Sequence, residues 1–144
     1  MPYVFIKDVI ADIGVEIRAN SLNNLFSEIV RSFYSILVQR LTAPVNPTPL
    51  RVKVKAVSLE ELIFKFVDEL IFIKDTKGLV SQSLVQCDIL VNKKAKVKYC
   101  LDAKLNFVGF ENIIAGVDIK AVSLHRFSVK QTQNGYKAVI VFDI

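Results

Sequence analysis

The sequence predicts an α+β fold in which a largely antiparallel β-sheet carries two amphipathic helices packed on one side. Two observations lead to this prediction. Two segments place apolar residues at helical spacing, and each follows a segment in which apolar and polar residues alternate. After the second helical segment, strand-like segments follow one another with only hairpin-length turns between them, which is typical of antiparallel sheets.

The first strand and the first helix lie within the first forty residues. Residues 13–19 alternate and predict a strand. Ser21 is the predicted N-cap of a long helix that ends near Arg40. Pro44, Pro47 and Pro49 then interrupt any periodicity, so this stretch predicts a rigid connector. The apolar stripe of the helix consists of Leu22, Leu25, Phe26, Ile29, Val30, Phe33, Ile36 and Leu37.

The second strand and helix follow the connector. Residues 50–57 alternate and predict a strand. Ser58 with Glu61 three residues later has the form of a capping box, which marks a helix start. Gly78 is the predicted end of this helix, because glycine readily adopts the left-handed conformation of a C-cap. Its buried stripe consists of Leu59, Leu62, Ile63, Phe66, Val67 and Leu70.

The rest of the chain is predicted to consist of strands. Residues 79–91 and 95–108 predict two long strands joined by a turn around residues 92–94. Residues 117–124 predict another strand. Residues 125–132 and 136–142 predict a hairpin, because Asn134-Gly135 between them is a strong turn signal.

Length and composition favour one domain over residues 1–144. At 52% hydrophobic residues, the chain has enough apolar side chains for a full core without disulfides or structural metals. No run approaches the roughly 18–20 apolar residues of a membrane span. The beginning of the sequence lacks the basic and apolar regions of a signal peptide. We therefore expect a cytoplasmic protein that does not associate with membranes.

The content of cysteine and histidine limits the kinds of metal site. Cys87 and Cys100 fall on predicted neighbouring strands, so a disulfide is geometrically conceivable, but we interpret them as two buried, reduced thiols. His125 is the only histidine. Because these three residues cannot assemble a zinc-type ligand set, any metal must be held by oxygen atoms.

The basic balance of the chain has two interpretations. The net charge is +5 and the pI is about 9.2, which raises the chance of an acidic or nucleic-acid partner. The basic residues alternate with apolar ones, as in residues 51–55 and 94–98. This alternation is typical of the solvent face of a half-buried strand. It favours a solvated basic face over an RNA-reading surface.

Carboxylates are the remaining candidates for chemistry, since the sequence has no phosphate-binding glycine loop and no nucleophile motif. Asp8 and Asp12 precede the first clear strand, where acids usually lie in a solvated turn. The sequence closes with Asp143 and Ile144, whose main chain supplies an α-carboxylate. If the first and last strands are neighbours, Asp12 and Asp143 converge. The three carboxylates would then suit Ca²⁺, Mg²⁺ or Mn²⁺.

Several segments, in order along almost the whole chain, resemble the archease family. Residues 8–14 (DVIADIG) resemble the family signature D-H-T-A-D-x-G, and residues 21–26 (SLNNLF) its T-L-E-E-A-F helix start. Residues 59–75 are similar to its second helix. Residues 118–125 (DIKAVSLH) are similar to E-V-K-A-V-T-Y-H, and Asp143-Ile144 to the ending of the family.

This resemblance implies a function and a set of site residues. Archeases are cytosolic, non-catalytic activators of the RtcB-type RNA ligase, which joins tRNA halves during splicing. They promote guanylylation of the ligase by GTP in the presence of Mn²⁺ and allow multiple turnover. By motif, the metal ligands would be Asp12, Asp143 and the α-carboxylate of Ile144. The resemblance further implies Ca²⁺ in the isolated protein, with Mn²⁺ or Mg²⁺ as alternatives, and assigns activation to Lys120 together with His125.

The sequence departs from the family pattern at two places. Val9 and Ile10 replace the histidine and threonine of the signature, and Asn23 and Asn24 replace acids at the helix start. The basic net charge is also unlike the acidic balance expected of the family. The alternative reading is therefore a basic α+β interaction module that binds RNA or another protein and has no role with a ligase. A stand-alone metal-dependent hydrolase is a poorer third reading, because only His125 is available as a base.

Overall fold

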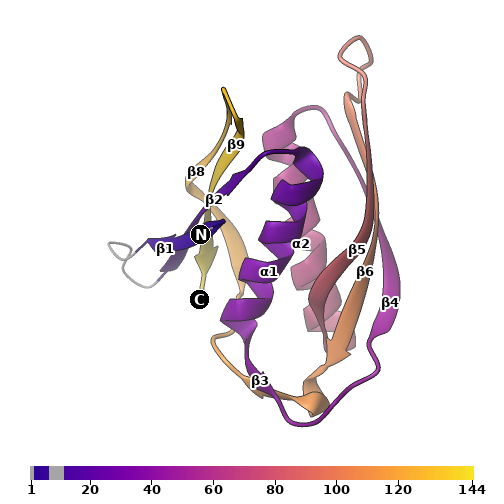
Figure 1. Ribbon diagram of the computed structural model, residues 1–144, viewed down its shortest axis with the longest axis vertical. Coiled ribbons are helices and arrows are strands. Elements are labelled where there is room, and N and C mark those ends of the chain that lie inside the picture. The colour runs from indigo at the N-terminus through magenta and orange to yellow at the C-terminus, as the bar shows by residue number, and fades with distance from the viewer. Residues whose placement is uncertain (1, 7–11) are drawn as a thin grey trace.

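The computed structural model describes residues 2–6 and 12–144, and it confirms the α+β class. Two helices, α1 (Leu22–Leu37) and α2 (Leu59–Lys77), lie between two antiparallel sheets (Figure 1). Each sheet therefore has the helices on one of its faces.

The strands form two main sheets and a short ribbon. In the described residues they are β1 (Tyr3–Ile6), β2 (Asp12–Ala19), β3 (Val38–Leu41), β4 (Thr48–Ala56), β5 (Leu79–Val91), β6 (Tyr99–Gly109), β7 (Ile113–Ala115), β8 (Ala121–Thr132) and β9 (Gly135–Asp143). The four-stranded sheet has the order β1-β2-β9-β8, and the three-stranded sheet has the order β4-β6-β5. The ribbon pairs β3 with β7, and a short 3₁₀ helix, Phe110–Asn112, precedes β7.

The hydrophobic core lies around the two helices and is tied together by aromatic contacts. Phe26 of α1 and Phe66 of α2 meet edge to face with ring centroids 5.1 Å apart. Phe33 of α1 meets Phe142 of β9 with centroids 6.1 Å apart. All four rings are fully buried. These contacts fix the position of β9 relative to α1, and β9 carries one of the candidate site residues.

The predicted starts of both helices are confirmed. The Ser21 hydroxyl accepts the backbone N–H of Asn24 at 3.1 Å, and the Ser58 hydroxyl accepts that of Glu61 at 3.1 Å. Gly78 ends α2 in the left-handed conformation, with φ 64°. Neither α1 nor α2 is long and apolar enough to span a membrane, and the same holds for any helix within the described ranges.

The predicted end of α1 near Arg40 is wrong. The helix ends at Leu37, because Val38 has an extended backbone and residues 38–41 form β3. β3 finds its partner in β7, far along the chain, and this pairing outweighs the continuing helical spacing of apolar residues. The predicted strand 95–108 also begins late, at Tyr99, because residues 92–98 form the turn between β5 and β6.

The two strands predicted at 117–124 and 125–132 are instead a loop followed by the single strand β8. In the register of β8 with β9, Ser123 pairs with Val141 and Ser128 pairs with Val139. The four residues 124–127 therefore form a large bulge opposite a single residue of β9. Phe127 at the end of the bulge packs on Phe64 of α2, with ring centroids 6.5 Å apart.

The cysteines are both free, but only Cys87 is buried. Cys87 pairs with Ala103, whose side chain faces the helices, whereas Cys100 pairs with Lys55 on the exposed face. The two thiols lie on opposite faces of the sheet, so a disulfide between them is excluded. Burial, with a smaller contribution from the Asp88 carboxylate, raises the pKa of the Cys87 thiol to about 11.

We expect Phe66→Ala to lower the free energy of unfolding by about 3–5 kcal/mol, because it leaves a cavity between the two helices. Phe72 on the same helix is 57% exposed, so Phe72→Ala is a matched control that should cost less than about 0.5 kcal/mol. Urea unfolding of both variants measures this difference. Equal losses would contradict the assignment of the core.

A thiol reagent at about pH 8 should modify Cys100 readily and Cys87 only slowly, because the thiolate is the reactive form. Mass spectrometry of the modified peptides identifies the site. Unfolding in urea should make both thiols reactive. Modification of Cys87 at the rate of Cys100 in the folded protein would contradict its burial.

Candidate functional site

The pairing of β2 with β9 places Asp12 directly opposite Asp143. The sequence prediction that these residues converge if the two strands are neighbours is therefore confirmed in its geometry. Paired residues of antiparallel strands have Cα atoms about 4.5–5.5 Å apart and side chains on the same face. Phe142 points into the core, so the adjacent Asp143 projects from the opposite face, away from the helices.

The two carboxylates are half-exposed and are not neutralised by the basic residues that the structure describes. No described lysine, arginine or histidine nitrogen lies within 4.0 Å of either carboxylate. Like charges directly opposite each other on a sheet repel, so such a pair needs hydration or a bound cation. The arrangement is therefore able to accept a positive charge from outside.

Lys120 is held beside this pair. Its backbone N–H donates to the carbonyl oxygen of Asp143 at 2.8 Å, and its side chain is exposed. The next residue, Ala121, pairs with Asp143 in the register of β8 and β9. The structure thus brings Asp12 together with Lys120 and Asp143, which lie more than a hundred residues later in the sequence.

The loop that carries Lys120, residues 116–120, is anchored at each of its positions. Gly116 and Val117 donate backbone hydrogen bonds, both of 2.8 Å, to the carbonyls of Leu37 and Ile36 at the end of α1. A Cβ on Gly116 would lie 2.4 Å from the Ile36 carbonyl oxygen, so glycine is required for this approach. Ile119 is fully buried.

Asp118 provides a further anchor of this loop through Lys74 of α2. Lys74 is only 2% exposed, and its ammonium nitrogen lies 2.8 Å from an Asp118 carboxylate oxygen. Asp75 is a second partner of the same ammonium group. Burial alone would lower the pKa of Lys74, but its hydrogen bonds to Asp118 and Asp75 raise it above the ordinary value of 10.5.

The sign of this pKa shift determines where the ion pair contributes to stability. A raised pKa means that the contribution is fully present below about 10.5 and is lost only as the pH rises through the higher folded value. The anchor of the loop is therefore intact across the neutral range.

Lys74 is a site residue that the sequence analysis did not identify. A signal was present, because Lys74 lies four residues after Leu70 and seven after Val67, on the buried stripe of α2. A lone cation at such a position indicates a partner of opposite charge within reach of its ammonium group. Finding Asp118 as that partner required the tertiary structure.

His125 is less closely associated with the site. It lies in the bulge of β8, is exposed, and donates its backbone N–H to the Ser123 hydroxyl at 3.1 Å. It forms no hydrogen bond or ion pair with Asp12, Asp143 or Lys120. Asp8, Val9 and Ile10 of the signature lie outside the described residues.

The side chains fit a metal site only in part. No group of three His, Cys, Asp or Glu side chains is arranged to hold a metal ion within the described ranges. Asp12 and Asp143 supply two hard oxygen ligands on one face of the sheet. The α-carboxylate of Ile144 as a third ligand stays a prediction, and this residue is 36% exposed.

Comparisons with known proteins agree along the whole chain. The sequence profile of the Archease protein family matches residues 3–144. Protein archease of Archaeoglobus fulgidus is 28% identical over 144 residues, covering 100% of both chains, and that of Pyrococcus abyssi is 28% identical over 138 residues, covering 93% of each.

Solved structures show the same fold. The solution structure of Protein 1598 of Methanobacterium thermoautotrophicum has a TM-score of 0.76 at 20% identity and covers 99% of both chains. The crystal structure of an archease from Thermotoga maritima, described as a possible chaperone, has a TM-score of 0.63 at 19% identity. It covers 96% of this chain and 98% of that one.

Replacing Lys74 with methionine should loosen the loop at residues 116–120 and leave the fold intact. Asp118 and Asp75 are more than half exposed and remain hydrated without Lys74. We therefore expect the free energy of unfolding to change by less than about 1 kcal/mol. Amide hydrogen exchange at Val117 and Lys120 should accelerate by about tenfold. Lys77→Met on the same helix is the control, and unchanged exchange in Lys74→Met would refute the anchoring role.

Proposed function

This chain belongs to the archease family, and from that premise we propose that it is a non-catalytic activator of an RtcB-type RNA ligase. In this role it promotes the guanylylation of the ligase by GTP and allows multiple turnover in the joining of tRNA halves. The observation that carries the proposal is the register of β2 and β9. This register places Asp12 directly opposite Asp143, and the backbone N–H of Lys120 donates a hydrogen bond to the carbonyl oxygen of Asp143.

The metal site of the proposal uses oxygen ligands from both ends of the sequence. Asp12, Asp143 and the main-chain carboxylate of Ile144 are its ligands. Such a hard, anionic set suits Ca²⁺ in the isolated protein and Mn²⁺ or Mg²⁺ in the presence of the ligase. When bound, the cation supplies positive charge at a surface that otherwise repels phosphate.

Lys120 is the residue that we assign to the contact with the ligase. Its side chain is exposed, while its backbone is held in place by the hydrogen bond to Asp143. The ammonium group can therefore move in solvent around a fixed backbone position. A lysine in this position acts as a mobile point charge toward a phosphate or an acidic residue of the partner. We assign His125 to the same interface, because it is exposed on the bulge of β8, the strand that begins directly after Lys120.

The possible chaperone role of the Thermotoga maritima archease fits the same scheme, because a chaperone also acts on a partner protein. The interaction-module reading differs from the activator reading at the C-terminal end of the chain. A binding module should tolerate extra residues after Ile144. An activator that uses the Ile144 carboxylate should not, because the extension converts this group into an amide.

Multiple-turnover RNA ligation by the cognate ligase with GTP and Mn²⁺ tests the proposal. We expect the native chain to stimulate ligation, and Lys120→Ala to reduce the rate to that without added protein. A variant with a few residues appended after Ile144 should also fail to stimulate. Lys77→Ala removes an exposed lysine at the end of α2 and should stimulate fully.

Each outcome has a separate meaning. Stimulation by the extended chain would remove Ile144 from the metal site and keep the activator role. Full stimulation by Lys120→Ala would refute the role of that lysine. A native chain that gives no stimulation with an active ligase would overturn the proposed function in favour of the interaction module.

A further inference from the structure

The net positive charge of the chain comes from one of its two main sheets. Strand β4 and the β5–β6 hairpin contain eight of the nineteen basic residues and two of the fourteen acidic residues. The remaining chain has eleven basic and twelve acidic residues, so the excess of +5 comes from this sheet alone. The basic residues of the sheet are Arg51, Lys53, Lys55, Lys93, Lys94, Lys96, Lys98 and Lys104.

Half of these residues are in the turn between β5 and β6, residues 92–98, which we call the basic turn. It projects beyond the rest of the molecule at the upper end of Figure 1. Backbone hydrogen bonds between residues 92 and 98 and between 95 and 92 give it a defined shape. All four of its lysines are exposed, and no carboxylate in the described part of the chain lies within 4.0 Å of their ammonium groups.

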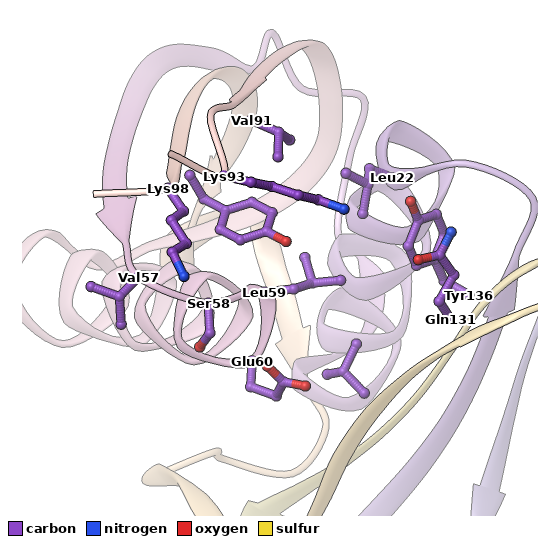
Figure 2. Close-up of a pocket in the computed structure, with 12 residues that line it drawn as sticks. Leu22, Val57, Ser58, Leu59, Glu60, Val91, Lys93, Lys98, Gln131 and Tyr136 are labelled. Atoms are coloured by element: carbon purple, nitrogen blue, oxygen red, sulfur yellow. The ribbon is translucent and has the colours of Figure 1, made fainter. Parts of the chain in front are cut away.

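A cleft of about 490 Å³ lies between the basic turn, the first turns of α1 and α2, and the adjoining end of β8 and β9. Figure 2 shows the Lys93 side chain reaching across this cleft toward Leu22 and the Lys98 side chain ending near Ser58. Leu22, Leu59, Val91 and Val129 give the cleft an apolar lining.

The same cleft contains two aromatic side chains, Tyr99 of β6 and Tyr136 of β9. Both are partly buried against the core, which holds their rings in place. Gln131 and Glu60 add groups that accept hydrogen bonds. The cleft therefore combines cations, fixed aromatic rings and acceptors in a volume suited to one flat, polar ligand group.

We propose that the basic turn and this cleft bind single-stranded RNA. Lysine ammonium groups along a groove hold the phosphates, and aromatic rings stack on unpaired bases, which is how single strands are bound without a fixed sequence. An acidic protein segment fits less well, because Glu60 repels a carboxylate in the cleft but accepts a hydrogen bond from an N–H group of a base. A duplex would present no unstacked base to the cleft.

The proposed RNA site is separate from the candidate site at Asp143. Tyr136 and Asp143 are seven residues apart on the extended strand β9, which corresponds to about 23 Å. Both surfaces can therefore be occupied together. RNA binding at the cleft does not depend on the proposed ligase activation, and it is measured in the absence of a ligase.

Fluorescence anisotropy with a labelled twelve-nucleotide oligouridylate tests this inference. We expect binding that weakens with salt, and Lys93→Gln/Lys98→Gln should reduce the affinity by about tenfold. The plot of log affinity against log salt concentration should become less steep by about 1.4 in the double variant. Each phosphate contact to a single strand contributes about 0.7 to the magnitude of this slope. The control Arg40→Gln/Lys77→Gln removes the same charge elsewhere and should change the affinity less than twofold.

The aromatic part of the proposal has its own tests. Tyr99→Leu should weaken binding by about tenfold without changing the salt slope, because stacking releases no counterions. Photocrosslinking of the native chain to an oligonucleotide containing 5-iodouridine checks the same contact without a substitution. We expect the crosslinked peptide to contain Tyr99 or Tyr136.

Several results would overturn the proposal. These are equal weakening by the two glutamine double variants, crosslinks confined to other parts of the chain, and binding of an RNA duplex as tightly as of the single strand. Displacement of the RNA by an equal concentration of a polyglutamate peptide would assign the surface to an acidic protein instead.

Discussion

The antiparallel pairing of β2 with β9 is the constraint on which the candidate site depends. It joins residues near the two ends of the sequence, so that Asp12 and Asp143 lie opposite each other on one face of the sheet. Because side chains alternate between faces, a shift of one residue in this register would move one carboxylate toward the helices and bury it without a partner. The apolar residues on the core face, Phe142 among them, therefore also fix the position of the acids on the exposed face.

Lys120 depends on the same pairing but is also positioned from the helices. The loop of residues 116–120 is bonded to the end of α1, to Lys74 of α2 and to Asp143 of β9. These contacts come from three different parts of the chain, so the position of the loop reports on the packing of the helices against the sheet. The ion pair joins the buried ammonium group of Lys74 to the exposed carboxylate of Asp118, which is consistent with a role in specifying one loop conformation.

Local features of the fold were predictable from the sequence, whereas the pairing of distant segments was not. The caps at Ser21, Ser58 and Gly78 depend on residues within one turn of the helix, and each was found where expected. The end of α1 was misplaced because residues 38–41 pair with β7, about seventy residues later, and no local signal reports such a partner. The bulge of β8 was missed for a related reason, since it is defined only against β9.

The candidate site was predictable to the same degree. Carboxylates at both ends of the sequence suggested a shared site, but only on the condition that their strands were neighbours, and the register of β2 and β9 satisfies this condition. Lys74 was not found, because a lysine in a helix is ordinarily solvated and only the tertiary structure shows this one to be buried. The alternating lysines of the basic turn predict the solvent face of a strand. Its projection from the sheet and the cleft below it became visible only in three dimensions.

The position of β9 within its sheet also has a consequence for the synthesis of the protein. β9 lies between β2 and β8, so β2 has a free edge until residues 135–143 have left the ribosome. The last turn of α1 has no basic residue. Two carbonyl groups at this end of the helix lack their hydrogen bonds until the backbone N–H groups of residues 116 and 117 are present. A nascent chain can therefore form its helices and the three-stranded sheet early, but it closes the four-stranded sheet last. Until then it exposes an apolar strand edge of the kind on which aggregation begins.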